Sequence, residues 1–550
     1  MLSSIEIAQR SHPQQITEIA KQIGLRHEEI QTFGPYKAKV SLDALKRLES
    51  HPDGKLILVT AMTPTPQGEG KTCTSIALTQ ALGGLGKRAM VCIRQPSMGP
   101  TFGVKGGGTG GGYSQLIPME DINLHFTGDN HAVEYAHNLL AGVIGNHIFR
   151  GNALDLDPEQ ILWRRVIDVP DRELRHFSAE VKEKGKTVKR PTGFDITASS
   201  EIMASLALSR DLKDLSERLT RIVVGFTRKG KPVTVADLHL QGTLTLILRE
   251  AARPNLVQTL EGQGAFVHTG PYANIAHGNS SVIATQLALK VAKYVVTESG
   301  FGSDLGLEKF FHIVCRQSGL RPDCVILVCS VKALHVHGGS ERDVTSLKNG
   351  FLNLKRHIEN IQKFGIKPIL CVNHYEDDQP WELQEVVAFG QSLGVEVSVS
   401  EGYLKGSKGA LDLAEKVLSA IQTNGGAFKF LYPLDIPIQE KIEWISKELY
   451  GAKGVRFSPV AQRSLNHLTA LGFGHLPINM AKTHLSFSDD PNVKGAPTDW
   501  TLRVQDLRVA AGAGFINCIV GHMLLLPGFP EHPIAQQITI ARDGRIEGLF

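Results

Sequence analysis

The sequence lacks the features that mark several large classes of protein. Its charges nearly balance, with 59 Lys and Arg against 55 Asp and Glu and a formal net charge of +4. Composition therefore gives no argument for nucleic acid or an anionic membrane as a partner. No stretch reaches the roughly 18 apolar residues of a membrane span, and the opening residues MLSSIEIAQRSHPQQ contain no apolar signal-peptide core. We expect a soluble protein of the cytoplasm.

Cysteine pairs and zinc motifs are also missing. The seven cysteines are scattered, odd in number and without a C-x-x-C pair. Several lie in apolar runs such as VILVCS and ILCVN, which predicts buried thiols in a reducing compartment. The polar cluster that contains Glu120, Asp121, His125, His131 and His137 has no H-E-x-x-H motif, so we expect it to contact substrate or support a site rather than bind zinc.

What the sequence does contain is a regular alternation of strand and helix patterns. Residues 55–62, KLILVTAM, predict a buried strand, about 71–85 a helix and 86–96 the next strand, which is the order of a parallel sheet. The first fifty residues have polar helical patterns that we expect to wrap this core.

A second alternating block begins near Pro322. Residues 323–334 predict a strand followed by a glycine-containing loop, and an apolar stripe from Leu347 to Phe364 predicts a long helix that ends at Gly365. Further strands are predicted in KPILCVN and GVEVSVSEGY, and a helix in ALDLAEKVLSAIQ.

A chain of 550 residues, 42% of them hydrophobic, is expected to form two to four domains. We predict an α/β fold with three parts. A domain with a parallel sheet like that of P-loop NTPases would span residues 1–320, a second, smaller α/β domain 321–423, and a C-terminal domain 424–550.

Residues 63–75, TPTPQGEGKTCTS, lie between the first predicted strand and helix. In the usual phosphate loop, G-x-x-x-x-G-K-[ST], backbone N–H groups and the helix N-terminus surround an anion. Thr65 stands at the first glycine position, which weakens the match, so a structural turn stays an alternative. We predict nucleotide binding, with Lys71 at the outer phosphates and the Thr72 hydroxyl on Mg²⁺. The predicted loop residues are Thr65, Pro66, Gln67, Gly68, Glu69, Gly70, Lys71 and Thr72.

The next predicted strand ends at Arg94, at the edge where parallel sheets bind ligands. We expect the planar guanidinium to clamp a carboxylate or phosphate, with a surface ion pair as the alternative. Residues 99–115 are dense in glycine, yet Phe102 and Tyr113 are poor linker residues. We therefore expect a loop in which backbones approach closely.

Together these segments resemble the formate–tetrahydrofolate ligase family, also called formyltetrahydrofolate synthetase. The resemblance covers nearly the whole chain in one order. Because the phosphate loop begins about sixty residues in, there is no room before it for the dehydrogenase/cyclohydrolase domain of related eukaryotic proteins, and we expect the stand-alone form. The matching segments are TPTPQGEGKT, RQPSMGPTFGVKGGGTGGGY, PMEDINLHFTGD, GPYANIAHGNS, SVKALHVHGG, MAKTHLSFSDD and the terminal GLF.

The resemblance implies an ATP-dependent ligase that converts formate to formyl phosphate and transfers the formyl group to N10 of tetrahydrofolate, giving 10-formyltetrahydrofolate, ADP and phosphate. Such phosphoryl transfer needs positioning and charge neutralisation rather than a protein nucleophile. By resemblance, Lys71 and Mg²⁺ would act at the γ-phosphate of ATP, and Arg94 would hold formyl phosphate. Family members form homotetramers, and we carry this expectation over.

The family also stacks the pterin ring of the folate between a Phe and a Trp. By resemblance, these positions are Tyr375 in VNHY and Tyr403 in SEGYLKGSKG, which both keep an aromatic face. Gln95 replaces a family Glu near a monovalent cation site, so activation by such a cation stays open.

Two other functions remain alternatives at this stage. The substitutions could mark a paralogous carboxylate-activating ligase with another acceptor, or a binding protein regulated by nucleotide without turnover. ADP release with and without formate and tetrahydrofolate would distinguish them. The sequence does not determine whether the folate is mono- or polyglutamylated.

Overall fold

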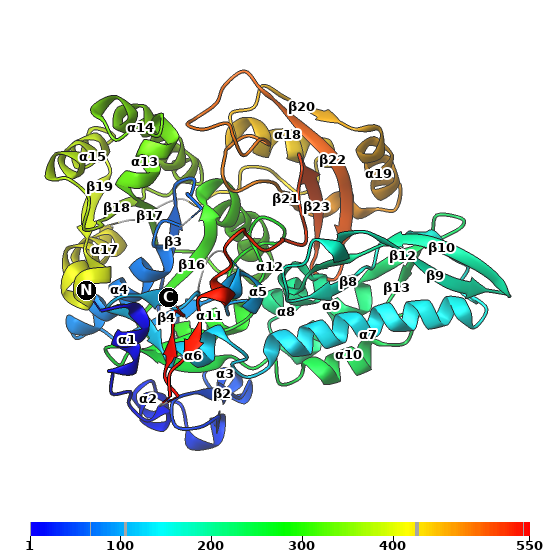
Figure 1. Cartoon of the computed structure of the whole chain (residues 1–550), viewed down its shortest axis with the longest axis horizontal. Helices are drawn as coiled ribbons and strands as arrows, with labels where there is room; N and C mark the ends of the chain where they lie inside the picture. Colours follow the sequence, from blue (N-terminus) through cyan, green and yellow to red (C-terminus); the bar gives the residue numbers. More distant parts are fainter. Residues whose placement is uncertain (1, 67, 104–106, 424–427, 543, 550) are drawn as a thin grey trace.

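The computed structural model describes residues 2–66, 68–103, 107–423, 428–542 and 544–549. A large, mostly parallel β-sheet lies at its centre, with helices on both faces (Figure 1). The strand order is β1 (Ile30–Thr32), β2 (Ala38–Val40), β14 (Asn255–Thr259), β15 (Gly264–Val267), β4 (Ala89–Ile93), β16 (Tyr294–Gly302), β3 (Lys55–Ala61), β17 (Cys324–Cys329), β18 (Ile369–Asn373) and β19 (Glu396–Ser400).

The strands from β15 to β19 run parallel, so their carboxyl ends meet at one edge of the sheet. Strands β14, β2 and β1 continue the sheet in antiparallel orientation. The small hairpin of β5 (Gly110–Gly111) and β6 (Ser114–Ile117) is attached to β14. Because ligands bind outside the carboxyl ends of such strands, this edge is where a site is expected.

Alternate residues of β3 pack on opposite faces of the sheet. Ile57 and Val59 join the apolar residues of α4 (Lys71–Gly84) and α17 (Leu411–Thr423). Leu56 and Leu58 join those of α2 (Ile16–Gln22), α11 (Val282–Val291), α14 (Val344–Lys363) and α15 (Pro380–Ser392) on the other face. Burial on both faces explains the continuous apolar runs in these strands. The seven cysteines are buried free thiols, as predicted.

The second alternating block extends this same sheet through β17, β18 and β19. The predicted strand over residues 323–334 is too long, because β17 ends at Cys329 and Ser330 caps α13 (Val331–Gly338). The predicted long helix is α14, and Gly365 follows it with φ 82°, as expected for a C-terminal cap. The predicted domain boundaries at 320 and 423 stay a prediction.

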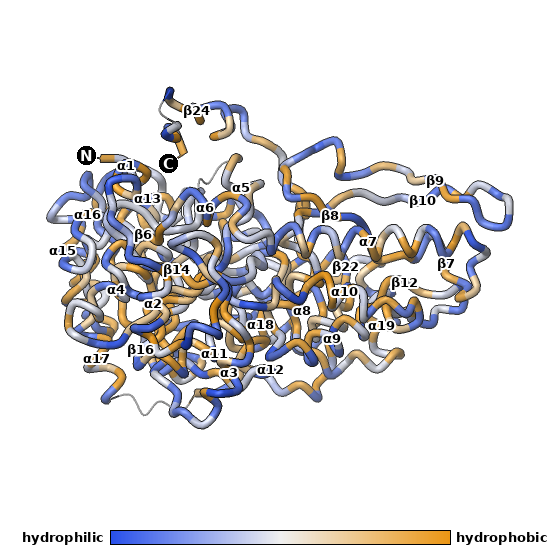
Figure 2. The backbone as a smooth tube through the Cα atoms, turned by 90° about the horizontal axis from the view of Figure 1, so that it is seen from below, coloured by the Kyte–Doolittle hydropathy of each residue, from blue (hydrophilic) through white to orange (hydrophobic). Residues whose placement is uncertain are grey.

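Residues between α7 and α10 form a lobe that projects from the sheet (Figure 1). Figure 2 shows the β9–β10 hairpin running beside α7, away from the sheet. The sequence analysis did not predict this lobe. Its elements are α7 (Asp129–Phe149), β7 (Leu156–Ile161), β8 (Arg165–Ile167), β9 (Phe177–Glu183), β10 (Lys186–Thr192), β11 (Phe194–Ile196), α8 (Glu201–Leu208), α9 (Leu212–Arg221), β12 (Val223–Thr227), β13 (Pro232–Thr234) and α10 (Gln241–Leu248).

The C-terminal part has a sheet of its own. This sheet shares a continuous hydrophobic cluster with the central one, through residues such as Ile442 and Phe515. Its strands and helices are α18 (Ile438–Glu448), β20 (Gly454–Phe457), α19 (Pro459–Ala470), β21 (Ile478–Ala481), β22 (Thr501–Ala510) and β23 (Phe515–Val520).

The first fifty residues contain the predicted helices, α1 (Ser4–Gln9), α2 and α3 (Asp43–Arg47), and also the unpredicted strands β1 and β2. Among the residues described, no helix combines the length and apolar content needed to cross a membrane.

The contact between α13 and α14 gives a test of the packing. A Cβ atom added at Gly350 on α14 would lie 2.8 Å from Leu334 Cα and still closer to the Leu334 carbonyl. Gly350→Ala must therefore push the helices apart, and we expect it to destabilise the protein by about 1–3 kcal/mol. Denaturant-induced unfolding measures this change.

Gly142→Ala is the matched control. Gly142 lies on the exposed side of α7, and nothing lies within 4 Å of its added Cβ. Alanine should stabilise this helix by about 0.5–1 kcal/mol. Two variants of equal stability would contradict the close packing of α13 and α14.

Candidate functional site

The loop between β3 and α4 lies at the carboxyl edge of the sheet. Gly70 precedes α4 with φ 77°, and the Asn373 side chain lies so close to its Cα that any Cβ would collide. Gly68 also has a positive φ, of 83°, whereas Thr65 does not. The first glycine of the motif is thus dispensable here, because its position has ordinary backbone geometry. Gln67 lies outside the described residues.

The start of α4 is suited to an anion. Gly70 offers no side chain to cap the helix, and the first-turn N–H groups point toward the loop. Together with the helix dipole, they attract phosphate oxygens. Lys71, the first helical residue, adds a positive charge at this point.

A buried carboxylate organises the inside of the loop. Glu69 is 1% exposed, and its Oε1 accepts a hydrogen bond of 2.7 Å from the Thr65 N–H. The Ser330 hydroxyl, at the end of β17, donates to Glu69 Oε2. These bonds fix the loop to the neighbouring strand.

Two histidines hold Thr63, at the beginning of the loop. His337 Nε2 donates to the Thr63 carbonyl at 3.0 Å, and its Nδ1 accepts from the Gly495 N–H. His357 Nε2 lies 2.9 Å from the Thr63 hydroxyl. Burial lowers the pKa of His337 to about 4, so this ring is neutral at physiological pH.

Glu298 connects the loop to Arg94. It lies on β16, between β3 and β4, and its side chain is 5% exposed. Its Oε2 accepts a 2.7 Å hydrogen bond from the Thr72 hydroxyl, while its Oε1 lies 3.5 Å from an Arg94 terminal nitrogen. The Glu298 carboxylate therefore positions two predicted site residues: Thr72, whose hydroxyl is predicted to bind Mg²⁺, and Arg94, whose guanidinium is predicted to bind an anion.

Arg94 retains donors that the protein does not use. Among the described residues, its only other hydrogen bond, to the Pro271 carbonyl, is long at 3.3 Å, and its buried Nε has no partner. Gly300 leaves room beside it, since an added Cβ would lie 3.0 Å from an Arg94 nitrogen.

Among the described residues, other buried polar atoms near Arg94 also lack a hydrogen-bond partner. One of these groups is the His277 ring, which is neutral because burial lowers its pKa to about 3. Native proteins pair most buried polar atoms, so such a group indicates a place for a ligand or ordered water. The atoms are Gln95 Oε1, Thr269 Oγ1, Asn274 Oδ1, both ring nitrogens of His277, Asn279 Oδ1 and Ser299 Oγ.

The two predicted stacking tyrosines follow adjacent strands. Asn373 at the end of β18 pairs with Ser400 at the end of β19, and Tyr375 and Tyr403 come just after these positions. Both are partly exposed. Burial, together with the Glu69 carboxylate, raises the pKa of Tyr375, so its phenol stays neutral.

The predicted close-approach loop is confirmed at Gly111 and Gly112. A Cβ at Gly111 would lie 2.9 Å from the Tyr403 ring, and one at Gly112 would collide with the Tyr403 carbonyl. The Tyr113 N–H donates to that carbonyl at 2.9 Å. The backbone of residues 111–113 therefore packs directly against Tyr403.

Several residues of this edge were missed by the sequence analysis, chiefly Glu298, Ser330, His337 and Asn373. Glu298 had a readable signal, because it is an acid inside the apolar run YVVTES. The polar cluster of residues 120–137 does not act as one unit. His137 is buried against Trp163, with its ring bonded to Ser200, whereas His125 and His131 are exposed.

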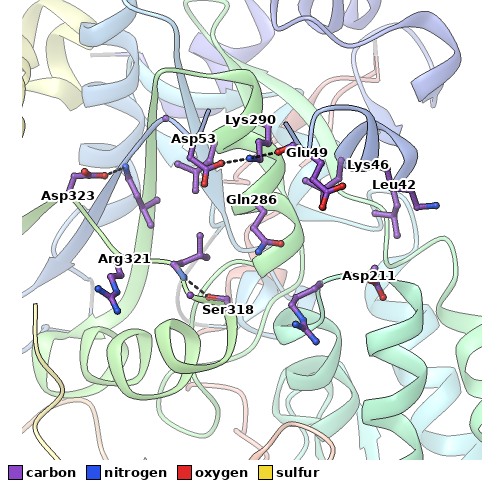
Figure 3. Close-up of a pocket in the computed structure, with 17 residues that line it drawn as sticks. Leu42, Lys46, Glu49, Asp53, Asp211, Gln286, Lys290, Ser318, Arg321 and Asp323 are labelled. Carbon is purple, nitrogen blue, oxygen red and sulfur yellow. Dashed lines mark hydrogen bonds and ion pairs between the residues drawn. The ribbon is translucent and has the colours of Figure 1, made fainter. Parts of the chain in front are cut away.

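A cavity of about 610 Å³ lies at the opposite edge of the sheet, by the amino ends of β3 and β17 (Figure 3). The charged Lys290 and Asp53 there pair with each other at 2.9 Å. Because this cavity is far from the loop and its lining has as many acidic as basic side chains, we place the candidate site at the carboxyl edge.

The family model described as formate--tetrahydrofolate ligase matches residues 2–550.

The anchoring of Glu69 can be tested with two serine variants. Ser330 and Ser458 both cap a helix, α13 and α19, but only Ser330 also donates to a buried carboxylate. Loss of a cap costs about 1 kcal/mol, and loss of a donor to a buried charged group adds about 1–3 kcal/mol. We expect Ser330→Ala to destabilise the protein more than Ser458→Ala and to weaken nucleotide binding.

Thermal unfolding and a nucleotide titration of both variants check this. The anchoring role of Ser330 is refuted if the two variants lose equal stability and bind nucleotide as the parent does.

Proposed function

The chain belongs to the formate–tetrahydrofolate ligase family and catalyses the ATP-dependent ligation of formate to tetrahydrofolate, and we propose that it does so through formyl phosphate at the carboxyl edge of the central sheet. The observation that carries the proposal is the linked arrangement of Thr72, Glu298 and Arg94 beside the start of α4. This arrangement brings together side chains that can bind a nucleoside triphosphate and side chains that can bind a second anion.

The loop would bind the phosphates of ATP. The N–H groups at the start of α4 and the Lys71 ammonium would compensate negative charge on the outer phosphates. A formate oxygen then attacks the γ-phosphorus in line, and the bond to the ADP oxygen breaks. Fixed positive groups lower this barrier, because they stabilise charge on the transferring phosphoryl group.

Arg94 would hold the formyl phosphate. Its unused donors and the unpaired polar atoms near it provide partners for phosphate oxygens. N10 of tetrahydrofolate attacks the formyl carbon, the carbon–oxygen bond to phosphate breaks, and the N10 proton is lost. Phosphate is then released as the leaving group.

The Thr72 hydroxyl and the Glu298 carboxylate fit an Mg²⁺ ion, since hard cations prefer such oxygens and Thr72 keeps lone pairs while it donates. Bound Mg²⁺ would neutralise charge on the phosphate oxygens. Gln95 offers a buried neutral oxygen without a donor, which suits a monovalent cation better than a divalent one. Both ions are part of this proposal.

Tyr375 and Tyr403 would hold the pterin of the folate. They follow adjacent parallel strands, and the glycine loop supports Tyr403. Aromatic faces at these positions stack on a flat ring. We also propose the homotetramer expected from the family, which a mass measurement in solution tests.

Lys71→Ala tests the phosphate loop. Loss of the ammonium should lower turnover by about 10²–10³-fold, because the charge acts mainly in the transition state. Lys87→Ala is the control, since Lys87 is exposed beyond the other end of α4. Steady-state ADP release checks both. A folded Lys71→Ala protein with turnover like that of Lys87→Ala would remove the loop from the mechanism.

Tyr403→Ala tests the folate position. Stacking contributes roughly 0.5–1.5 kcal/mol beyond the buried area, so tetrahydrofolate binding should weaken by more than about tenfold once the area is also lost. ATP binding should stay unchanged. Trp444→Ala removes an exposed aromatic ring of α18 and serves as control. If Tyr403→Ala binds the folate like the parent, the pterin lies elsewhere.

A further inference from the structure

Arg190, in the projecting lobe, is a cation with no counterion among the residues that the structure describes. It lies on β10 and is only 6% exposed. Within the described part of the chain, no side chain or carbonyl accepts a hydrogen bond from it, and it forms no ion pair. Burial lowers the pKa of Arg190, and the nearby charge of Arg165 lowers it further.

Two further groups with unused donors lie beside it. Thr192 is two residues along β10 and therefore on the same face as Arg190, and its buried hydroxyl has no partner. The Arg165 N–H donates to the Gly193 carbonyl, which places β8 next to this end of β10. Arg165 is half-buried, and its guanidinium has no acceptor among the described residues.

This arrangement is unfavourable for the protein alone. A guanidinium with most of its surface removed from water loses part of its hydration energy, which an acceptor or an anion can replace. An apolar side chain would fit the inner face of the hairpin, as Val181 and Val188 do, without that cost. Two arginines and a hydroxyl with unsatisfied donors are instead the groups that bind carboxylates and phosphates.

We propose that Arg190, Arg165 and Thr192 form a second oxyanion site, between the β9–β10 hairpin and β8, separate from the phosphate loop. It takes a carboxylate or phosphate group, whose oxygens accept from the guanidinium groups and from the threonine hydroxyl. The donors that the protein leaves unused are satisfied when this anion binds.

The surroundings favour an anion that enters from solution. The hairpin exposes Lys182, Lys184 and Lys186 near its turn, and these charges attract anions over a Debye length. Strand β8 leads directly to Asp168, whose carboxylate accepts from the N–H groups of Met98 and Gly99, just after Arg94. The lobe site is thereby connected to the proposed formyl phosphate position.

Two kinds of oxyanion could occupy this site. One is free orthophosphate, a product of the reaction, and the other is the carboxylates of the glutamate tail of the folate. The second source rests on the proposed function, whereas the first does not.

Isothermal titration with orthophosphate tests the site directly, with saturating MgADP in the phosphate loop. We expect Arg190→Met to weaken one class of phosphate binding at least about tenfold, because it removes a charged double donor. Lys186→Met removes an exposed charge of the same hairpin and should change this affinity less than about twofold. Phosphate bound near Arg94 remains in all three proteins.

A second arm compares KM for mono- and triglutamyl tetrahydrofolate. A rise for the triglutamate alone in Arg190→Met, with kcat unchanged, assigns the site to the tail. Equal KM values together with lost phosphate binding assign it to free phosphate. Either result supports an oxyanion site.

The proposal is overturned if Arg190→Met matches the parent in both arms. Should Arg190→Met not fold, Arg165→Met, at a half-buried position of the same site, gives the same comparison. Phosphate binding is measured without turnover, so a failure of the lobe site stays distinguishable from a failure of the ligase mechanism.

Discussion

The contact on which the rest of the site depends is the Glu298 carboxylate, which accepts from the Thr72 hydroxyl and faces Arg94. It can do both because β16 lies between β3 and β4 in the sheet. A shift of one residue along β16 would turn this side chain to the other face, so the strand register is itself part of the site.

The central sheet brings the proposed ATP and folate positions to one edge. Strands β4 and β18 are four strand spacings apart, which is roughly 19 Å at the usual separation. The long Arg94 side chain reaches over β16, and the loop after β3 lies between it and the tyrosines. Buried groups such as His337 and Tyr375 stay neutral there, whereas Lys71 and Arg94 bring positive charge to this edge.

Strong local signals predicted the elements correctly. The apolar run after Lys55 forms β3, the glycine-rich loop leads into α4, and Gly365 follows α14 with the left-handed geometry of a cap. The prediction failed where a local signal was ambiguous. The apolar residues Val331 and Leu334 continue the pattern of a strand, but Ser330 caps a helix there. The projecting lobe was not predicted because three of its strands have only three residues and its hairpin is polar.

By itself, the sequence predicted the chemistry of the loop, because glycine, lysine and threonine at that spacing can surround phosphate only between a strand and a helix. It also determined the family, through segments spread over the chain. Only the tertiary structure decided that Glu298, distant in sequence, joins Thr72 to Arg94, and that Arg190 has no counterion within the described parts of the chain. Such facts depend on which strands become neighbours, and pairing between distant segments leaves no local pattern in the residues concerned.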